Sequence, residues 1–456
     1  MSVARLNGSH ADLDWHREAI SIIRRAAPEV PILLDIPGKK IRTIQLAHEP
    51  NFKQGDEIIL TTDQTQDGSV KVPVNNLTLH ESLSEGANIF ADDGTLRFTV
   101  ISVEGRDIRC RAETDGTLRS RKGINVPFVK LATVLVTDRD REMVGFARDN
   151  GVDFIGISFV ESAAHVEAIR ELTGGNWPRI VAKIENQGGL DNMDEILDAT
   201  DAAMIDRGDL SVETSLENLA VFQKQITARA RVHGKPVIIA TEVLHTMIEN
   251  PFPTKAEVSD ITNAVMDGCA ATMLSGETAV GKFPIETVSI MRRVVASAEE
   301  YEQTMLDSAR SSVTRMEQAM EDAAALVCRS LPVTKIVAVT MTGYAARMLA
   351  ARRPRQPILA VSNDPIAARS FNILPGTKGV YLDVDFTIDS TDHVVECLRL
   401  LWQKGEIDND DLIFVASVGY PKPGNLMNLL QSHRVQDLVE TLGWERQLDT
   451  PAERQI

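Results

Sequence analysis

Short runs of apolar, β-branched residues alternate along most of the chain with segments that have helical periodicity. Continuous apolar strands that alternate with helices indicate a parallel sheet buried on both faces. Polar residues recur at the C-terminal ends of these strands, which favours a closed (β/α)8 barrel of the TIM type. The rival fold is an open doubly wound sheet, but the G-x-G-x-x-G turn that would support it does not occur. The predicted strands are Pro31–Ile36, Val152–Phe159, Ile180–Glu185, Ala202–Ile205, Pro236–Thr241 and Ala270–Leu274.

Two further blocks have a different pattern. Residues 39–125 show short strands and Gly/Asp turns with almost no helical periodicity, which predicts an inserted β-rich domain. A third block follows the helical stretch near 290–330 and predicts a small α/β domain. We therefore expect a barrel domain from 1–38 and 126–300, a β-rich lid domain at 39–125 and a C-terminal α/β domain at 301–456.

The predicted elements of these two blocks are short. The lid domain has strands at Glu57–Thr61, Leu96–Val100 and Asp107–Arg111, and turns at Asp67-Gly68, Asp93-Gly94 and Asp115-Gly116. The strands predicted for the C-terminal domain are Ile336–Thr340, Pro357–Val361, Gly379–Leu382 and Asp411–Ala416.

Composition narrows the class of protein. A chain of 456 residues exceeds what one hydrophobic core usually supports. The net charge of −17 disfavours partners such as nucleic acid and anionic membranes. The four cysteines form no Cys-x-x-Cys pair, and no apolar run is long enough to span a membrane. We expect a soluble, cytoplasmic protein with reduced thiols.

Charged side chains gather at two predicted strand ends. Lys183 and Glu185 are two residues apart on a strand, so their side chains point the same way. Asp209 follows the next strand and adds a carboxylate at the same end. Two carboxylates suit a hard cation such as Mg²⁺ or Mn²⁺, and a lysine beside it can stabilise negative charge on a phosphoryl group or an enolate. The alternative is a structural Lys–Glu ion pair.

Two weaker signals lie near these strand ends. Thr241 ends a strand, and its hydroxyl could bind a carboxylate or relay a proton, although such a threonine commonly caps the next helix. Gly208 begins a predicted helix whose free N–H groups suit a carboxylate.

The sequence resembles the pyruvate kinase family along nearly the whole chain. The order and the spacing of several motifs match those of the family. The most specific are Ala4-Arg5-Leu6-Asn7-Gly8-Ser9-His10, Leu34-Asp35, Lys183-Ile184-Glu185-Asn186, Arg207-Gly208-Asp209-Leu210, the run from Gly234 to Thr241, Pro253-Thr254-Lys255-Ala256-Glu257 and the run from Met273 to Ala279.

The resemblance implies a phosphotransferase that moves the phosphoryl group of phosphoenolpyruvate to ADP, giving pyruvate and ATP. Glu185 and Asp209 would hold the divalent metal, Mg²⁺ or Mn²⁺. Lys183 would contact the transferred phosphoryl group and the enolate oxygen, and Arg5 would bind the phosphate. The inserted domain would act as a lid that excludes water.

Further positions follow from the same resemblance. The N–H groups of Gly208 and Asp209 would receive the substrate carboxylate together with Thr241, which would lie near the protonation path. Lys40 stands where K⁺-dependent members carry Glu, so its ammonium would replace K⁺; the alternative is a solvated lysine at the lid hinge. The monovalent-cation site matches Asn7, Ser9, Asp35 and the carbonyl of Ile36, and the positions that approach the nucleotide match His10, Arg42 and Lys122.

Several residues depart from the family pattern. The chain begins just ahead of Ala4, so the strand and helix that start the barrel in the family have no counterpart. We expect either a start farther upstream, or a barrel that is open, patched by a partner or short of one strand. Other changes add negative charge near a site for anionic substrates, which should weaken their binding. The changed positions are Glu161 and Ser162 in place of Arg-Lys, Asp206 in place of Ala, Ser211 in place of Gly, Glu242 in place of Gln and Trp15 in place of Tyr.

Three interpretations of function remain at this point. The first is a divergent, metal-dependent and K⁺-independent pyruvate kinase that forms a homo-oligomer, either a tetramer or a dimer. The second is a lyase or aldolase-type enzyme that holds a pyruvate enolate without nucleotide, and the third is a weakly active or non-catalytic regulatory protein. The segment Thr340–Tyr344 resembles the loop that binds a phosphorylated effector in regulated members; the alternative is an ordinary strand-to-helix connection.

Overall fold

The chain folds into two compact units. The computed structural model describes residues 1–38, 40–92, 94–127, 129, 135–306, 316–386, 390–418 and 427–445. One unit contains Arg5–Ile22 and Ile32–Met291, and the other contains Met1–Ala4, Ile23–Pro31 and the described residues of Arg292–Ile456. The first unit carries two large sheets and the second carries one.

The first sheet follows the order of the chain without reversal. A doubly wound sheet reverses its strand order at a switch point, so this order favours the barrel interpretation among the described strands. The strands from β2 to β16 pair in parallel, as predicted. The order is β1 (Ala4–Asn7), β2 (Ile32–Ile36), β12 (Phe154–Ile157), β13 (Arg179–Ile184), β14 (Ala202–Asp206), β15 (Val237–Ala240) and β16 (Ala271–Thr272).

The described residues supply 7 strands to this sheet, not the eight of a complete barrel. Every residue of β2 and β14 is buried, as expected for strands covered on both faces.

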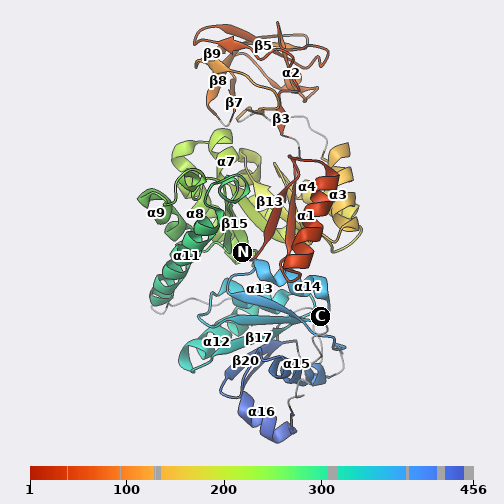
Figure 1. Cartoon of the computed structure of the whole chain (residues 1–456), viewed down its shortest axis with the longest axis vertical. Coiled ribbons are helices and arrows are strands. Elements are labelled where there is room, and N and C mark those ends of the chain that lie inside the picture. The colour runs from red at the N-terminus through yellow and green to blue at the C-terminus, as the bar shows by residue number, and fades with distance from the viewer. Residues whose placement is uncertain are drawn as a thin grey trace, which may run out of the picture. The chain divides into compact units, whose positions relative to one another are not determined.

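Helices connect these parallel strands. Helices α4 and α8 contact the neighbouring strands β13 and β14, and Figure 1 shows both beside the sheet. The capping boxes that begin α3 and α9 explain why these helices start at Asp138 and Lys255. The helices are α1 (Leu13–Ala26), α3 (Asp138–Asp149), α4 (Ala163–Thr173), α5 (Gln187–Asp191), α6 (Met193–Ala199), α7 (Arg207–Glu213), α8 (Leu219–Val232), α9 (Lys255–Met266), α10 (Gly276–Ala279) and α11 (Pro284–Leu306), with short 3-10 turns at Leu216–Asn218 and His245–Ile248.

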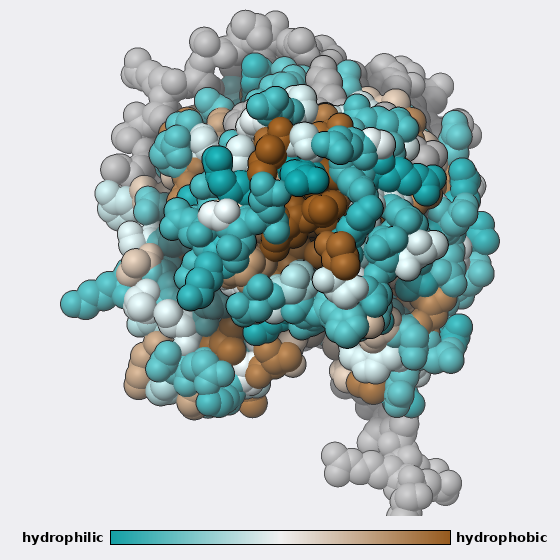
Figure 2. Space-filling model, turned by 90° about the horizontal axis from the view of Figure 1, so that it is seen from above, coloured by the Kyte–Doolittle hydropathy of each residue, from teal (hydrophilic) through white to brown (hydrophobic). Residues whose placement is uncertain are grey.

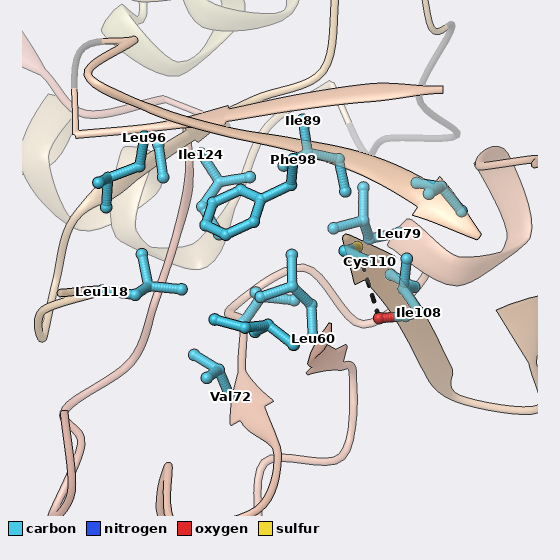
Figure 3. Close-up of a cluster of buried hydrophobic side chains, with 14 of the residues drawn as sticks. Leu60, Val72, Leu79, Ile89, Leu96, Phe98, Ile108, Cys110, Leu118 and Ile124 are labelled. Atoms are coloured by element: carbon cyan, nitrogen blue, oxygen red, sulfur yellow. Dashed lines mark hydrogen bonds between the residues drawn. The ribbon is translucent and has the colours of Figure 1, made fainter. Parts of the chain in front are cut away.

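The second sheet of the first unit is built from the inserted β-rich segment. Its core is apolar and continuous, and Figure 3 shows Phe98 among aliphatic side chains such as Leu60 and Ile89. The predicted turn at Asp93-Gly94 includes Asp93, which lies outside the described residues. The sheet order is β3 (Ile41–Arg42), β11 (Gly123–Asn125), β7 (Asn88–Ala91), β8 (Leu96–Glu104), β9 (Asp107–Ala112), β5 (Glu57–Thr61) and β6 (Val72–Pro73), with a separate pair β4 (Asn51–Phe52) and β10 (Gly116–Thr117) and a short helix α2 (Leu79–Ser82).

The second unit contains the predicted C-terminal α/β fold. Its first four strands in sheet order are parallel, and β21 pairs with β20 in antiparallel fashion. The order is β19 (Thr377–Tyr381), β18 (Ile358–Ser362), β17 (Lys335–Val339), β20 (Leu412–Ser417) and β21 (Leu429–Arg434). The helices are α12 (Met316–Ser330), α13 (Tyr344–Ala351), α14 (Pro365–Ser370), α15 (Asp392–Gln403) and α16 (Val435–Leu442), with a 3-10 turn at Phe371–Ile373.

The surface agrees with the composition. Figure 2 shows a face on which hydrophilic side chains predominate around a central hydrophobic patch. No helix in the described parts of the chain is long and apolar enough to cross a bilayer.

Candidate active site

Three neighbouring strands of the first sheet end in polar residues. β13 is followed by Glu185, β14 ends in Asp206, and β15 is followed by Thr241. These strands pair in parallel, so their carboxyl ends meet at one edge of the sheet. This edge is where the catalytic residues of barrel enzymes lie.

Lys183 lies among carboxylates at this edge. Its Nζ is 2.6 Å from Glu185 Oε1 and 3.2 Å from Asp206 Oδ2. Carboxylate oxygens of Glu185, Asp206 and Asp209 all lie within 4.8 Å of one another. Glu185 is completely buried, and its Oε2 accepts a hydrogen bond of 2.6 Å from the backbone N–H of Phe159. We call these three acids the carboxylate cluster.

Burial and charge set the protonation states in this cluster. Burial raises the pKa of Glu185 to about 8, although Lys183 acts in the opposite direction. Burial acts to lower the pKa of Lys183, but the nearby carboxylates outweigh it, so the pKa is raised and the ammonium stays charged. Burial acts to raise the pKa of Asp206, but the charge of Lys183 outweighs it and the pKa is lowered. The site holds more acid than one lysine neutralises.

The carboxylate cluster fits a hard divalent cation. Mg²⁺ and Mn²⁺ prefer carboxylate oxygens, and three such oxygens converge here. Glu185 and Asp209 were predicted as metal ligands from the sequence, and the structure brings them together. The sequence analysis noted Asp206 as a departure from the family pattern. The structure adds its carboxylate to the same cluster, as its position at the end of a parallel strand could have indicated.

Gly208 and Thr241 form a second part of the site. The N–H of Gly208 donates to Thr241 Oγ1 at 2.8 Å, and that hydroxyl donates to the carbonyl of Ala240 at 2.7 Å. Thr241 is not the N-cap of the next helix, because the following 3-10 turn is capped by Leu244. The helix-cap alternative for this threonine is therefore wrong.

The backbone at Thr241 is strained and held in place. Thr241 and Glu242 have φ angles of 65° and 52°, in the left-handed region that side chains disfavour. Arg207 donates to the carbonyls of both residues, at 3.0 Å and 3.3 Å, and to Asp260 at 2.8 Å. The buried guanidinium thus fixes the turn that presents the Thr241 hydroxyl.

Arg5 and Asp35 form a partly buried ion pair, and Asp35 also acts electrostatically on Lys183. Arg5 Nε donates to Asp35 Oδ2 at 2.7 Å. Arg5, which is expected to bind the substrate phosphate, therefore has a carboxylate partner in this structure. The same carboxylate explains the glycine at position 156, because a Cβ added to Gly156 would lie 1.9 Å from Asp35 Oδ1.

The residues predicted for a monovalent cation lie on or just after the neighbouring strands β1 and β2. Asn7 Oδ1 accepts a hydrogen bond from the N–H of Ser9 at 3.1 Å. The carbonyl of Ile36 accepts from Ser158 Oγ at 3.0 Å, and Ser158 Oγ also accepts from Lys183 Nζ at 3.2 Å. Ser158 thus links Ile36 to Lys183, a role that sequence reasoning missed. Its place one residue after β12 was the available signal.

Lys40 contacts the carboxylate cluster. Its Nζ lies 2.5 Å from Asp209 Oδ1 and 5.8 Å from the centre of the Phe159 ring. The side chain is 15% exposed. The interpretation of Lys40 as a solvated hinge lysine is therefore wrong.

The predicted nucleotide-binding residues make other contacts. Lys122 Nζ pairs with Asp92 Oδ1 at 2.6 Å, and Arg42 donates to the carbonyl of Arg121 at 3.1 Å. The carbonyl of His10 accepts from His16 Nε2 at 3.0 Å. Arg42 and Lys122 come from adjoining parts of the paired strands β3 and β11 and their flanks.

Glu213, at the end of α7, provides a pH-dependent contribution to stability. Its Oε1 accepts from Asn125 Nδ2 at 2.7 Å. Burial raises the pKa of Glu213 from 4.5 to about 7, and Asp209 and Glu161 add to this effect. Because the folded state holds this proton more tightly, its contribution is full below pH 4.5 and is lost as pH rises through 7. We expect a loss of about 1–3 kcal/mol over this range.

The comparison of wild type with Glu213→Gln measures this contribution. A glutamine oxygen can still accept the bond from Asn125 but does not titrate. Between pH 5 and pH 8 the thermal unfolding midpoint of the wild type should fall more than that of the variant. Parallel midpoints over this range would contradict the assignment.

A buried lysine among carboxylates at the strand ends of a parallel sheet is typical of a barrel enzyme that stabilises negative charge on its substrate. Sequence comparison identifies the family. The profile of the pyruvate kinase barrel domain matches residues 1–288, and that of the pyruvate kinase alpha/beta domain matches residues 318–431. The chain belongs to the pyruvate kinase family and is a phosphotransferase of that kind.

Individual relatives agree along most of their length. The chain is 37% identical over 436 residues to pyruvate kinase of Clostridium perfringens, which covers 92% of this chain and 91% of the relative. It is 35% identical over 454 residues to that of Geobacillus stearothermophilus, covering 96% and 77%. For Thermococcus litoralis the identity is 34% over 449 residues, covering 94% and 93%. Members of the family use a divalent metal and ADP.

Proposed function

We propose that the chain transfers the phosphoryl group of phosphoenolpyruvate to ADP, and that it does so without K⁺. The observation that carries this proposal is the buried Lys183 ammonium, held 2.6 Å from Glu185 within the carboxylate cluster. Family membership favours this activity over the lyase and the non-catalytic interpretations.

Each residue of the site has a separate role in the proposed reaction. Lys183 is charged and positioned to stabilise negative charge on the phosphoryl group and then on the enolate oxygen. The N–H groups of Gly208 and Asp209 and the hydroxyl of Thr241 would receive the substrate carboxylate. The Gly208 N–H and the Thr241 hydroxyl would exchange their present bonds to Thr241 Oγ1 and the Ala240 carbonyl for it. A divalent cation held by Glu185 and Asp209 would supply further positive charge for the phosphoryl oxygens.

The remaining assignments rest on the resemblance. Arg5 exchanges part of its contact with Asp35 for the substrate phosphate. The inserted segment at 39–125 acts as the lid, and Arg42, Lys122 and His10 approach ADP. We also propose a cytoplasmic homo-oligomer and a phosphorylated effector at Thr340–Tyr344, where the N–H of Gly343 donates to Thr340 Oγ1 at 3.0 Å ahead of α13.

Pyruvate formation from phosphoenolpyruvate, ADP and Mg²⁺ tests the proposed function directly. We expect turnover by the purified chain and dependence on both substrates and on the metal. A folded protein that forms no pyruvate would exclude the activity.

Independence from K⁺ is a separate prediction about Lys40. Its ammonium lies on Asp209, inside the site, and supplies a fixed positive charge there. Wild-type turnover should be the same in K⁺ and in tetramethylammonium buffers. Lys40→Glu should lower the rate about 10- to 100-fold without K⁺, and K⁺ should restore part of it. Wild-type turnover that requires K⁺ would contradict this assignment.

A further inference from the structure

Asp206 is an acid that the family pattern does not contain at this position. It occupies the last residue of β14, directly before the Arg207-Gly208-Asp209 motif. The residue is 7% exposed, so its charge is buried. A buried carboxylate is costly unless a cation compensates it.

The structure places this carboxylate at the centre of the charged site. One oxygen, Oδ2, lies 3.2 Å from Lys183 Nζ. The other oxygen, Oδ1, lies on the side of Gly208, because a Cβ built on Gly208 would lie 3.7 Å from it. Carboxylate oxygens of Asp206, Glu185 and Asp209 all lie within 4.8 Å of one another. Asp206 is therefore within reach of anything that Glu185 and Asp209 bind in common.

The ammonium groups of Lys183 and Lys40 both contact the carboxylate cluster, which indicates that this part of the site attracts cations. Lys183 contacts Glu185 and Asp206, and Lys40 contacts Asp209 at 2.5 Å. Among the described residues, the cluster contains three carboxyl groups and two lysines contact it. A divalent cation would add positive charge there, which favours an anionic substrate. The third carboxyl group thus strengthens metal binding to the free protein.

We propose that Asp206 is a third carboxylate ligand of the divalent cation, so that the metal binds tightly before any substrate arrives. This inference rests on the proposed function only in taking the carboxylate cluster as the metal site. Metal affinity rises with the number of charged ligands. A site with two carboxylates leaves more of the coordination sphere to water and to substrate oxygens.

Binding of Mn²⁺ to the substrate-free protein, measured by electron paramagnetic resonance, tests the proposal. Asp206→Ala removes the ligand, and Asp206→Asn keeps its size and an oxygen that can accept from Lys183. We expect the dissociation constant to rise about 10- to 100-fold in both variants. Water-proton relaxation should show an additional water on the bound Mn²⁺ of Asp206→Ala.

A matched control separates ligation from the general field of a nearby charge. Glu161→Gln removes one acid whose side chain contacts Asn186 and is not in the cluster. It should change the Mn²⁺ dissociation constant less than threefold. Equal weakening by Glu161→Gln and Asp206→Asn would overturn the proposal, and so would an unchanged constant in both Asp206 variants. Circular dichroism establishes that each variant is folded.

The outcome is distinct from that of the proposed function. Loss of Mn²⁺ affinity in the Asp206 variants would support the third ligand even if the wild type formed no pyruvate. If the wild type forms pyruvate but the Asp206 variants bind Mn²⁺ as tightly as the wild type does, Asp206 is not a ligand. The proposed function would be unaffected by that result.

Discussion

Replacing Lys183 with methionine should reduce pyruvate formation by about 10³-fold, with little change in overall fold. The ammonium is the buried cation that contacts both Glu185 and Asp206. Methionine has a similar length but no charge, so negative charge that develops on the phosphoryl group and the enolate loses its stabilising partner. A steady-state assay with phosphoenolpyruvate, ADP and Mg²⁺ measures the effect as a loss of kcat.

Lys224→Met is the matched control for this experiment. Lys224 is also a lysine paired with an acid, Asp267, but its side chain is 58% exposed on α8. Exposed ion pairs contribute little, so we expect unchanged turnover. Turnover of Lys183→Met within tenfold of the wild type would contradict the role given to Lys183. Thermal unfolding midpoints show whether either variant is misfolded.

Replacing Glu185 with glutamine should produce the second large effect. Glutamine can still accept the bond that the Phe159 N–H now gives to Oε2 at 2.6 Å, so the turn after β12 should be kept. The amide lacks the charge that binds a cation. We expect Mn²⁺ affinity to fall about 100-fold or more and kcat/KM to fall about 10²- to 10³-fold. Titration of Mn²⁺ and the pyruvate assay measure the two losses separately.

Glu277→Gln provides a control of equal burial. Glu277 is 3% exposed and accepts from the N–H groups of Leu244 and Ser275, but it is not part of the carboxylate cluster. Its replacement should leave Mn²⁺ affinity unchanged. If both glutamine variants lose metal binding equally, the loss reflects general damage to the fold. If neither does, Glu185 is not a metal ligand.

Much of the fold follows from local patterns in the sequence. Each predicted strand of the parallel sheet is present, because an apolar β-branched run can satisfy its backbone and bury its side chains only inside such a sheet. The boundaries move by a few residues. Val152–Phe159 shortens to Phe154–Ile157, and Phe159, two residues beyond the strand end, has a φ of 54° and so is no longer extended.

The sequence predicted those candidate catalytic and metal-binding residues that lie at the ends of strands. Parallel strands bring their carboxyl ends to one edge, so Lys183, Glu185 and Asp209 were expected together and are together. The family motifs pointed to the same residues and also implied a role for each of them. The resemblance placed the Lys40 ammonium near the monovalent-cation site, but its contact with Asp209 was not predicted, since a flexible side chain beyond the strand end can reach several carboxylates.

Sequence alone therefore determined the alternating strand–helix order, the inserted β-rich segment and the strand ends that carry charge, because these depend on neighbours along the chain. Tertiary structure alone decided which groups meet across strands: Asp206 with Lys183, Ser158 with Ile36, and Gly156 against Asp35. Such contacts join residues that are far apart in the chain. Their distances follow from strand register and side-chain packing, which no local pattern encodes.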